Sequence, residues 1–189
     1  VREKLLELAR GELGTKEAPV GSNRVKYNTA YYGREVSGPA YPWCCVFQWW
    51  LFRQAGAGEL FYAGGKTASC TELYRYYKKR GRTVDPAELQ SGDLVFFVFD
   101  GGISGGMNHV GICESVKNGF VTTIDGNTGT DCEANGGAVL RRRRALRFVG
   151  GAARPEEEKE EMKQYRYVSE MPGWAQTAAE KAIAAGVIK

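Results

Sequence analysis

A change of pattern at Gly92 constrains the fold of this chain most strongly. Before that residue apolar side chains recur at helical spacing, whereas after it short apolar segments alternate with glycine-rich turns. Short apolar segments bounded by turns are typical of β-strands. Helices followed by neighbouring strands predict an α+β domain with an antiparallel sheet. We expect strands at about residues 93–99, 108–116, 119–125, 138–143 and 146–152.

Three helices are expected before Gly92, at about residues 2–13, 43–52 and 69–80. The first ends at Gly14 and the third at Gly81, since glycine favours the end of a helix. The second follows Pro42 and is apolar on nearly every face, which is typical of a helix buried inside a domain. The polar, tyrosine-rich stretch between the first two helices is predicted to be loop with short helical turns.

The composition excludes several classes of function. The hydrophobic fraction of 43% and the charged fraction of 25% are typical of globular proteins. No stretch approaches the roughly 20 consecutive apolar residues of a membrane span, so we expect no membrane partner. The net charge of +4 is mild, and the arginines at 141–144 are interpreted as a polar strand. No nucleic-acid-binding motif accompanies them, so we expect no nucleic-acid partner, and we expect a monomer.

The chain is predicted to divide into three parts. Residues 1–155 suit one folded domain, residues 156–166 form a charged linker, and residues 167–189 form a helical segment too short to bury its own apolar face. The first ten residues are an amphipathic helix rather than a signal sequence. We therefore expect that an exported form leaves the cell by another route or has had a leader trimmed.

Cys44 is the candidate nucleophile. It falls in the first turn of the helix predicted at 43–52, where unpaired N–H groups and the helix dipole stabilise a thiolate. The same N–H groups can hold the negative oxygen that forms when a thiolate attacks an amide carbonyl. The alternative is that Cys44 is a small buried hydrophobic residue. The other cysteines are interpreted as buried bystanders, namely Cys45, Cys70, Cys113 and Cys132.

His109 is the only histidine and hence the only candidate base for a Cys/His mechanism. It enters an apolar strand after a glycine-rich turn, where a side chain can face a cleft from a rigid sheet. Asp125 and Asn127 lie two residues apart in the following strand, so both are expected to point the same way. Either side chain could orient the imidazole, and ordinary turn chemistry is the alternative for both.

Four blocks in this order resemble the CHAP family, the cysteine, histidine-dependent amidohydrolases/peptidases. The blocks are Tyr-Pro-Trp-Cys-Cys ending at Cys45, Ser-Gly-Asp-Leu-Val-Phe-Phe ending at Phe97, Asn-His-Val-Gly-Ile around His109, and Ile-Asp-Gly-Asn-Thr from Ile124. The resemblance covers about residues 1–155. It implies a papain-like α+β fold in which the nucleophile begins a buried helix packed on an antiparallel sheet.

The resemblance also implies roles for the site residues. Cys44 corresponds to the nucleophile and His109 to the base, with Asp125 and Asn127 as orienting and supporting groups. The family often has glutamate at the position of Asp125, so the shorter side chain leaves the division of labour with Asn127 open. Some members carry an aspartate-rich calcium loop before the nucleophile, but residues 33–40 contain one carboxylate. We expect no metal and no cofactor.

The function implied by the resemblance is hydrolysis of bacterial peptidoglycan, at the N-acetylmuramoyl-L-alanine amide or within the stem peptide or its cross-bridge. The enzyme would act outside the cell or in the cell wall, as a secreted protein or as a phage endolysin released at lysis. The tail from about Tyr165 resembles a short helical repeat that follows lytic domains in some clostridial phage and cell-wall proteins.

Three aromatic residues, Tyr27, Tyr41 and Trp43, are candidates to line the substrate groove, with packing beneath loops as the alternative. Two other functions remain open at this stage. One is a Cys/His amidase that acts on an amide outside the wall, and the other is a wall-binding module with weak catalysis.

Overall fold

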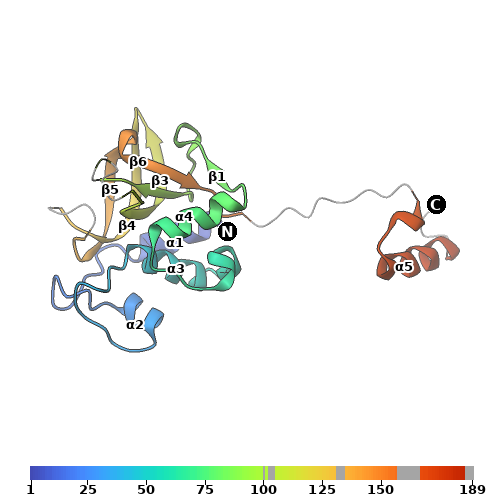
Figure 1. Ribbon diagram of the computed structural model, residues 1–189, viewed down its shortest axis with the longest axis horizontal. Coiled ribbons are helices and arrows are strands. Elements are labelled where there is room, and N and C mark those ends of the chain that lie inside the picture. Colours follow the sequence, from blue (N-terminus) through green and yellow to red (C-terminus); the bar gives the residue numbers. More distant parts are fainter. Residues whose placement is uncertain (100, 102–104, 131–134, 157–166, 186–189) are drawn as a thin grey trace. The chain divides into compact units, whose positions relative to one another are not determined.

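A computed structural model of the chain describes residues 1–99, 101, 105–130, 135–156 and 167–185. The chain divides into two compact units, Val1–Glu157 and Glu158–Lys189. The first unit combines helices with a six-stranded antiparallel sheet in the order β1-β6-β2-β3-β4-β5 (Figure 1). The predicted α+β class is therefore confirmed.

The elements of the first unit follow the expected order. The α-helices are α1 (Arg2–Gly11), α2 (Lys26–Tyr32), α3 (Cys44–Gln54) and α4 (Cys70–Lys79). The strands are β1 (Thr83–Val84), β2 (Leu94–Phe97), β3 (His109–Lys117), β4 (Phe120–Thr128), β5 (Ala138–Ala145) and β6 (Val149–Ala153). Short 3-10 turns are η1 (Gly58–Leu60), η2 (Tyr62–Gly64), η3 (Pro86–Glu88) and η4 (Leu146–Phe148).

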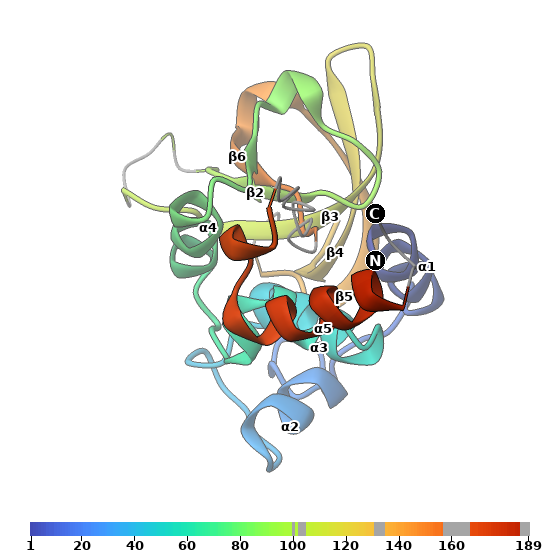
Figure 2. The ribbon, with the colours of Figure 1, turned by 90° about the vertical axis from the view of Figure 1, so that its right-hand side faces the viewer.

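Helix α3 is the central helix of the first unit. It packs on β3 and β4, with α1 beside it, while α4 packs against β6 (Figures 1 and 2). Helix α2 packs on the outer side of α3. Nearly every residue of α3 is buried, which explains why its sequence is apolar on all faces.

Both faces of the sheet are covered, as strand β2 shows. All four of its residues are buried, and they alternate between two apolar clusters. Leu94 and Phe96 belong to the larger cluster, which includes the buried apolar residues of α1, α3 and α4. Val95 and Phe97 belong to a smaller cluster with Cys113, Val121, Ala152 and Leu89. The large cluster holds α3, and with it Cys44, against the sheet.

One local prediction differs from the structure. The stretch predicted as loop with short helical turns contains helix α2, which ends at Gly33 in a left-handed conformation, with φ of 71°. The strand predicted at 146–152 begins only at Val149, because residues 146–148 form η4. Only η4 joins β5 to β6, although β2, β3 and β4 lie between them in the sheet. The sheet must therefore curl, and η4 makes the turn.

The second unit contains η5 (Val168–Glu170) and α5 (Gly173–Ala184). None of the α5 side chains is buried, and Trp174 is 83% exposed. The predicted charged linker lies outside the described residues from position 157 to position 166. Within the described parts of the chain, no helix combines the length and the apolar character that crossing a bilayer requires.

Candidate active site

Cys44 is the first residue of α3 and is 5% exposed. The preceding residue, Trp43, caps the helix without a side-chain hydrogen bond to it, so no capping side chain occupies the N–H groups of the first turn. Trp43 is instead anchored by its indole N–H, which donates to Glu17 Oε1 at 2.8 Å. The thiol thus lies at the positive end of a buried helix whose start is held in place.

His109, the first residue of β3, is held by a buried carboxylate. Its Nε2 lies 2.9 Å from Asp125 Oδ2, and both side chains are fully buried. Arg144 of β5 donates to the same carboxylate oxygen at 2.6 Å. Because Nε2–H donates to Asp125, Nδ1 is the free ring nitrogen, and it makes no hydrogen bond within the described residues. The geometry presents one basic nitrogen for proton transfer.

The thiol and the imidazole lie close enough to shift each other's pKa. A hydrogen bond with Cys70 and burial raise the pKa of the Cys44 thiol, and His109 opposes this rise. Burial lowers the pKa of His109, but the hydrogen bond with Asp125 and the nearby thiol of Cys44 outweigh this effect and raise the pKa to about 9. We therefore expect the resting site to hold a protonated thiol beside a cationic imidazole at neutral pH.

Asp125, rather than Asn127, contacts His109. The pairing of β4 with β5 shifts between Asp125 and Thr128, and Asn127 has a φ of 57°. The strand is not regularly extended there, so the alternation from which both side chains were expected to point the same way does not hold. The Asn127 amide is fully buried, and neither of its polar atoms has a partner in the described part of the chain.

Two glycines of the CHAP-like blocks make room for the site. A Cβ on Gly111 would lie 2.0 Å from Asp125 Oδ1, because the carboxylate crosses directly over this residue of β3. A Cβ on Gly126 would lie 2.7 Å from both Phe47 and Trp43, where β4 approaches α3. The first glycine therefore admits the carboxylate, and the second admits the helix that carries the thiol.

Gly111→Ala is expected to lower kcat by about 10- to 100-fold, because the new methyl group displaces the Asp125 carboxylate from His109. The measurement is kcat and KM for amide hydrolysis. Gly58→Ala is the matched control, since nothing lies within 4 Å of its added Cβ. Equal kcat values for the two variants would show that the close contact between Gly111 and the Asp125 carboxylate is unimportant for catalysis.

Cys70 is one residue of this site that sequence reasoning missed, and Arg144 is another. Cys70 Sγ lies 3.5 Å from Cys44 Sγ, and Cys70 is the first residue of α4. The Ser69 hydroxyl accepts from the N–H of Glu72 and so begins that helix. Ser69 was therefore the sequence signal that places Cys70 at the start of a helix, the same position that Cys44 has in α3. Cys45 differs, because its thiol donates to the Thr67 carbonyl at 3.4 Å.

The three aromatic candidates for the groove have different positions. Tyr27 and Trp43 are 0% exposed and pack against each other with ring centroids 5.4 Å apart. Both belong to the apolar core beneath the thiol, so the expectation that they line a groove is wrong. Tyr41 is partly exposed, and its ring meets that of Tyr32 edge-on at 5.1 Å.

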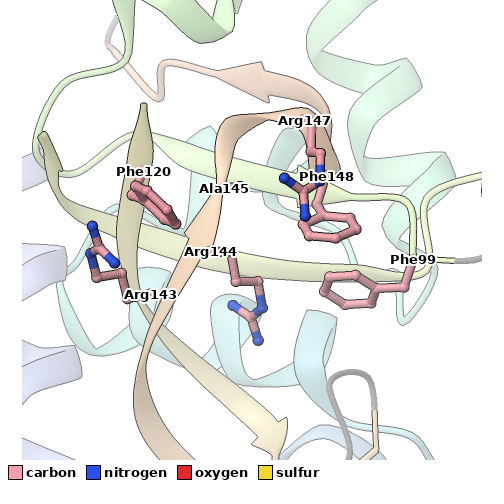
Figure 3. Close-up of a pocket in the computed structure, with 7 residues that line it drawn as sticks. All are labelled: Phe99, Phe120, Arg143, Arg144, Ala145, Arg147 and Phe148. Carbon is pink, nitrogen blue, oxygen red and sulfur yellow. The ribbon is translucent and has the colours of Figure 1, made fainter. Parts of the chain in front are cut away.

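A cavity of about 390 Å³ lies beside Arg144 (Figure 3), the residue that donates to the buried Asp125 carboxylate. Its lining residues are Phe99, Phe120, Arg143, Arg144, Ala145, Arg147 and Phe148. Phe99 also packs against the ring of His109, with centroids 6.0 Å apart. The cavity thus borders Arg144, which holds the carboxylate that orients the imidazole. Within the described residues, no group of three or more His, Cys, Asp or Glu side chains is arranged to hold a metal ion.

Comparison with known proteins finds a match to one family model and to several solved chains, two of which are structures of one protein. Residues 36–127 match the family model of the CHAP domain, which supports a CHAP domain within the first unit. The crystal structure of Ly7917 is 19% identical over 82% of this chain and 62% of that chain, with a TM-score of 0.48. The crystal structure of Ly7917 with the hydrolyzing product of MDP is 17% identical over 82% of this chain and 63% of that chain, with a TM-score of 0.47. This chain thus spans less than two thirds of those proteins. No curated protein matches it.

Proposed function

We propose that this CHAP-domain chain is a cysteine hydrolase that cleaves an amide bond of bacterial peptidoglycan, with Cys44 as nucleophile and His109 as general base. The observation that carries the proposal is the buried imidazole beside the thiol, held by Asp125 so that Nδ1 alone is free. The CHAP match covers all of these residues.

The proposed reaction begins when neutral His109 takes the proton of Cys44 at Nδ1. The thiolate attacks the amide carbonyl carbon, and the first-turn N–H groups of α3 hold the oxygen that becomes negative. His109 then protonates the leaving amine, and water that it deprotonates hydrolyses the thioester. Asp125 and Arg144 keep the imidazole in one tautomer. The unpaired Asn127 amide is proposed as a supporting polar group in the same site.

Peptidoglycan is proposed as the substrate because CHAP domains are cysteine-histidine amidohydrolases and peptidases that act mainly on cell walls. The bond is either the N-acetylmuramoyl-L-alanine amide or an amide of the stem peptide or cross-bridge. The proposed location is outside the cell or in the wall, including release from a phage-infected cell at lysis. We propose a monomer with no cofactor.

The test is digestion of purified walls from several bacteria, with mass spectrometry of the soluble products. New amine ends without new reducing sugar ends are expected, and the identity of the amine tells which amide is cut. Cys44→Ala protein prepared in the same way controls for a contaminating hydrolase. Turnover of small amides without release from any wall would contradict the peptidoglycan assignment. Sedimentation with walls but no new amine ends would indicate a binding module.

The pH dependence follows from the protonation of the resting site. Catalysis needs the cationic imidazole to lose its proton, so that neutral His109 can accept the proton of the Cys44 thiol. The pKa of His109 is about 9. We therefore expect kcat/KM to rise about tenfold per pH unit below that value and then to level off. The measurement is kcat/KM on a soluble wall fragment. A flat profile between about pH 6 and pH 8 would show that the thiolate and imidazolium are already formed at rest.

A further inference from the structure

We propose that Cys70 is a resolving thiol for Cys44, so that oxidation joins the two sulfurs in a disulfide bond and blocks the site reversibly. The loss of activity on oxidation rests on the proposed function, in which Cys44 is the nucleophile. Formation of the bond itself does not, because it depends only on the positions of the two thiols.

The geometry brings the two sulfurs into contact. Cys44 Sγ and Cys70 Sγ lie 3.5 Å apart, and each cysteine is the first residue of its helix. A disulfide bond has sulfurs about 2.05 Å apart, so an approach of roughly 1.5 Å closes it. Both residues are nearly buried, with Cys44 5% and Cys70 6% exposed. We therefore expect a small oxidant from solvent to reach the thiols when the site opens.

Other cysteines in the described residues are poorer partners for Cys44. Cys45 is its chain neighbour, and a bond between adjacent residues departs from the usual separation of bonded Cα atoms. The Cys45 thiol also donates to the carbonyl of Thr67 at 3.4 Å. Cys113 belongs to the apolar cluster on the opposite face of the sheet. Cys70 is thus the described thiol that contacts the nucleophile.

The chemistry balances with a peroxide as oxidant. Peroxide transfers one oxygen to the Cys44 thiolate, which becomes a sulfenic acid, and water or an alcohol leaves. Cys70 sulfur then attacks Cys44 sulfur, the S–S bond forms, and the sulfenic oxygen leaves as water with the Cys70 proton. A dithiol such as dithiothreitol reduces the bond by exchange and restores both thiols. Without Cys70, a second peroxide converts the sulfenic acid to sulfinic acid, which dithiothreitol does not reduce.

The experiment treats the reduced full-length protein with hydrogen peroxide and follows both the bond and the activity. Because a thiolate reacts faster than a thiol, the reaction is run at about pH 8.5. Trypsin then releases Cys44 and Cys45 together in peptide 35–53 and Cys70 in peptide 67–75. We expect these peptides to be linked, with the loss of two hydrogens. Persistence of the link in Cys45→Ser protein assigns it to Cys44.

Variants separate a resolving role from general sensitivity to oxidation. Wild-type protein is expected to recover most of its activity in dithiothreitol, whereas Cys70→Ser, measured against its own reduced activity, is expected to stay inactive. Cys113→Ser is the matched control and is expected to recover like the wild type. Recovery of Cys70→Ser to the wild-type extent would overturn the proposal.

The peptide analysis of wild-type protein stands alone if a variant does not fold. Absence of the linked peptide after peroxide treatment would also overturn the proposal. The linked peptide in a protein that releases nothing from walls would instead support the disulfide while contradicting the proposed function.

Discussion

Cys44→Ala is expected to lower kcat/KM for wall hydrolysis by about a thousandfold or more, because it removes the atom that forms the covalent intermediate. Within the described residues, no other thiol of the site has His109 acting on its pKa. Cys70 contacts Cys44, but His109 acts to lower the pKa of Cys44. The measurement is the rate of release of amine ends from purified walls, with circular dichroism to show that the fold is retained.

Cys45→Ala is the matched control for this prediction. It makes the same change one residue further along α3, at a side chain that is fully buried and hydrogen-bonded to a loop carbonyl. We expect it to keep most of the activity while losing some stability, since it leaves a small cavity. If Cys45→Ala is inactive and Cys44→Ala is active, the nucleophile is misassigned.

Asp125→Asn is expected to lower kcat by about a hundredfold or more, because the imidazole loses the carboxylate that selects its tautomer. The hydrogen bond with Asp125 also raises the pKa of His109, so the rising limb of the pH profile should move to lower pH. Arg144 is 4% exposed and would lose its buried counter-ion. We expect a loss of unfolding free energy on the order of 3 kcal/mol.

Comparison with Asn127→Gly makes the Asp125 prediction specific. Glycine tolerates the positive φ of this position, so the substitution removes the amide without backbone strain. The amide has no partner in the described structure, so we expect a loss of activity below about tenfold and no shift of the pH profile. A larger loss for Asn127→Gly than for Asp125→Asn would reverse the roles of the two residues. The measurements are kcat against pH and chemical denaturation.

Local patterns in the sequence predicted the features that depend on neighbouring residues. The helical spacing and terminal glycines indicated α1, α3 and α4, and the short apolar segments indicated β2 to β5, with ends within a few residues of those observed. Cys44 at the start of a helix was predicted for the same reason, because a helix terminus depends on a few adjacent residues. Helix α2 was predicted only as short helical turns within a loop, because its polar tyrosines show no clear apolar periodicity.

Contacts between distant segments were decided only by the tertiary structure. The sequence determined the α+β class, the helix that carries the thiol and the strand that carries His109. It did not determine that Asp125 rather than Asn127 reaches the imidazole, because a bulge in β4 interrupts the alternation of side chains. Nor did it indicate that Cys70 meets Cys44 across 26 residues or that Arg144 meets Asp125 across 19. Such pairs depend on how α4 and β5 pack, and packing follows from burial of the whole core rather than from local spacing.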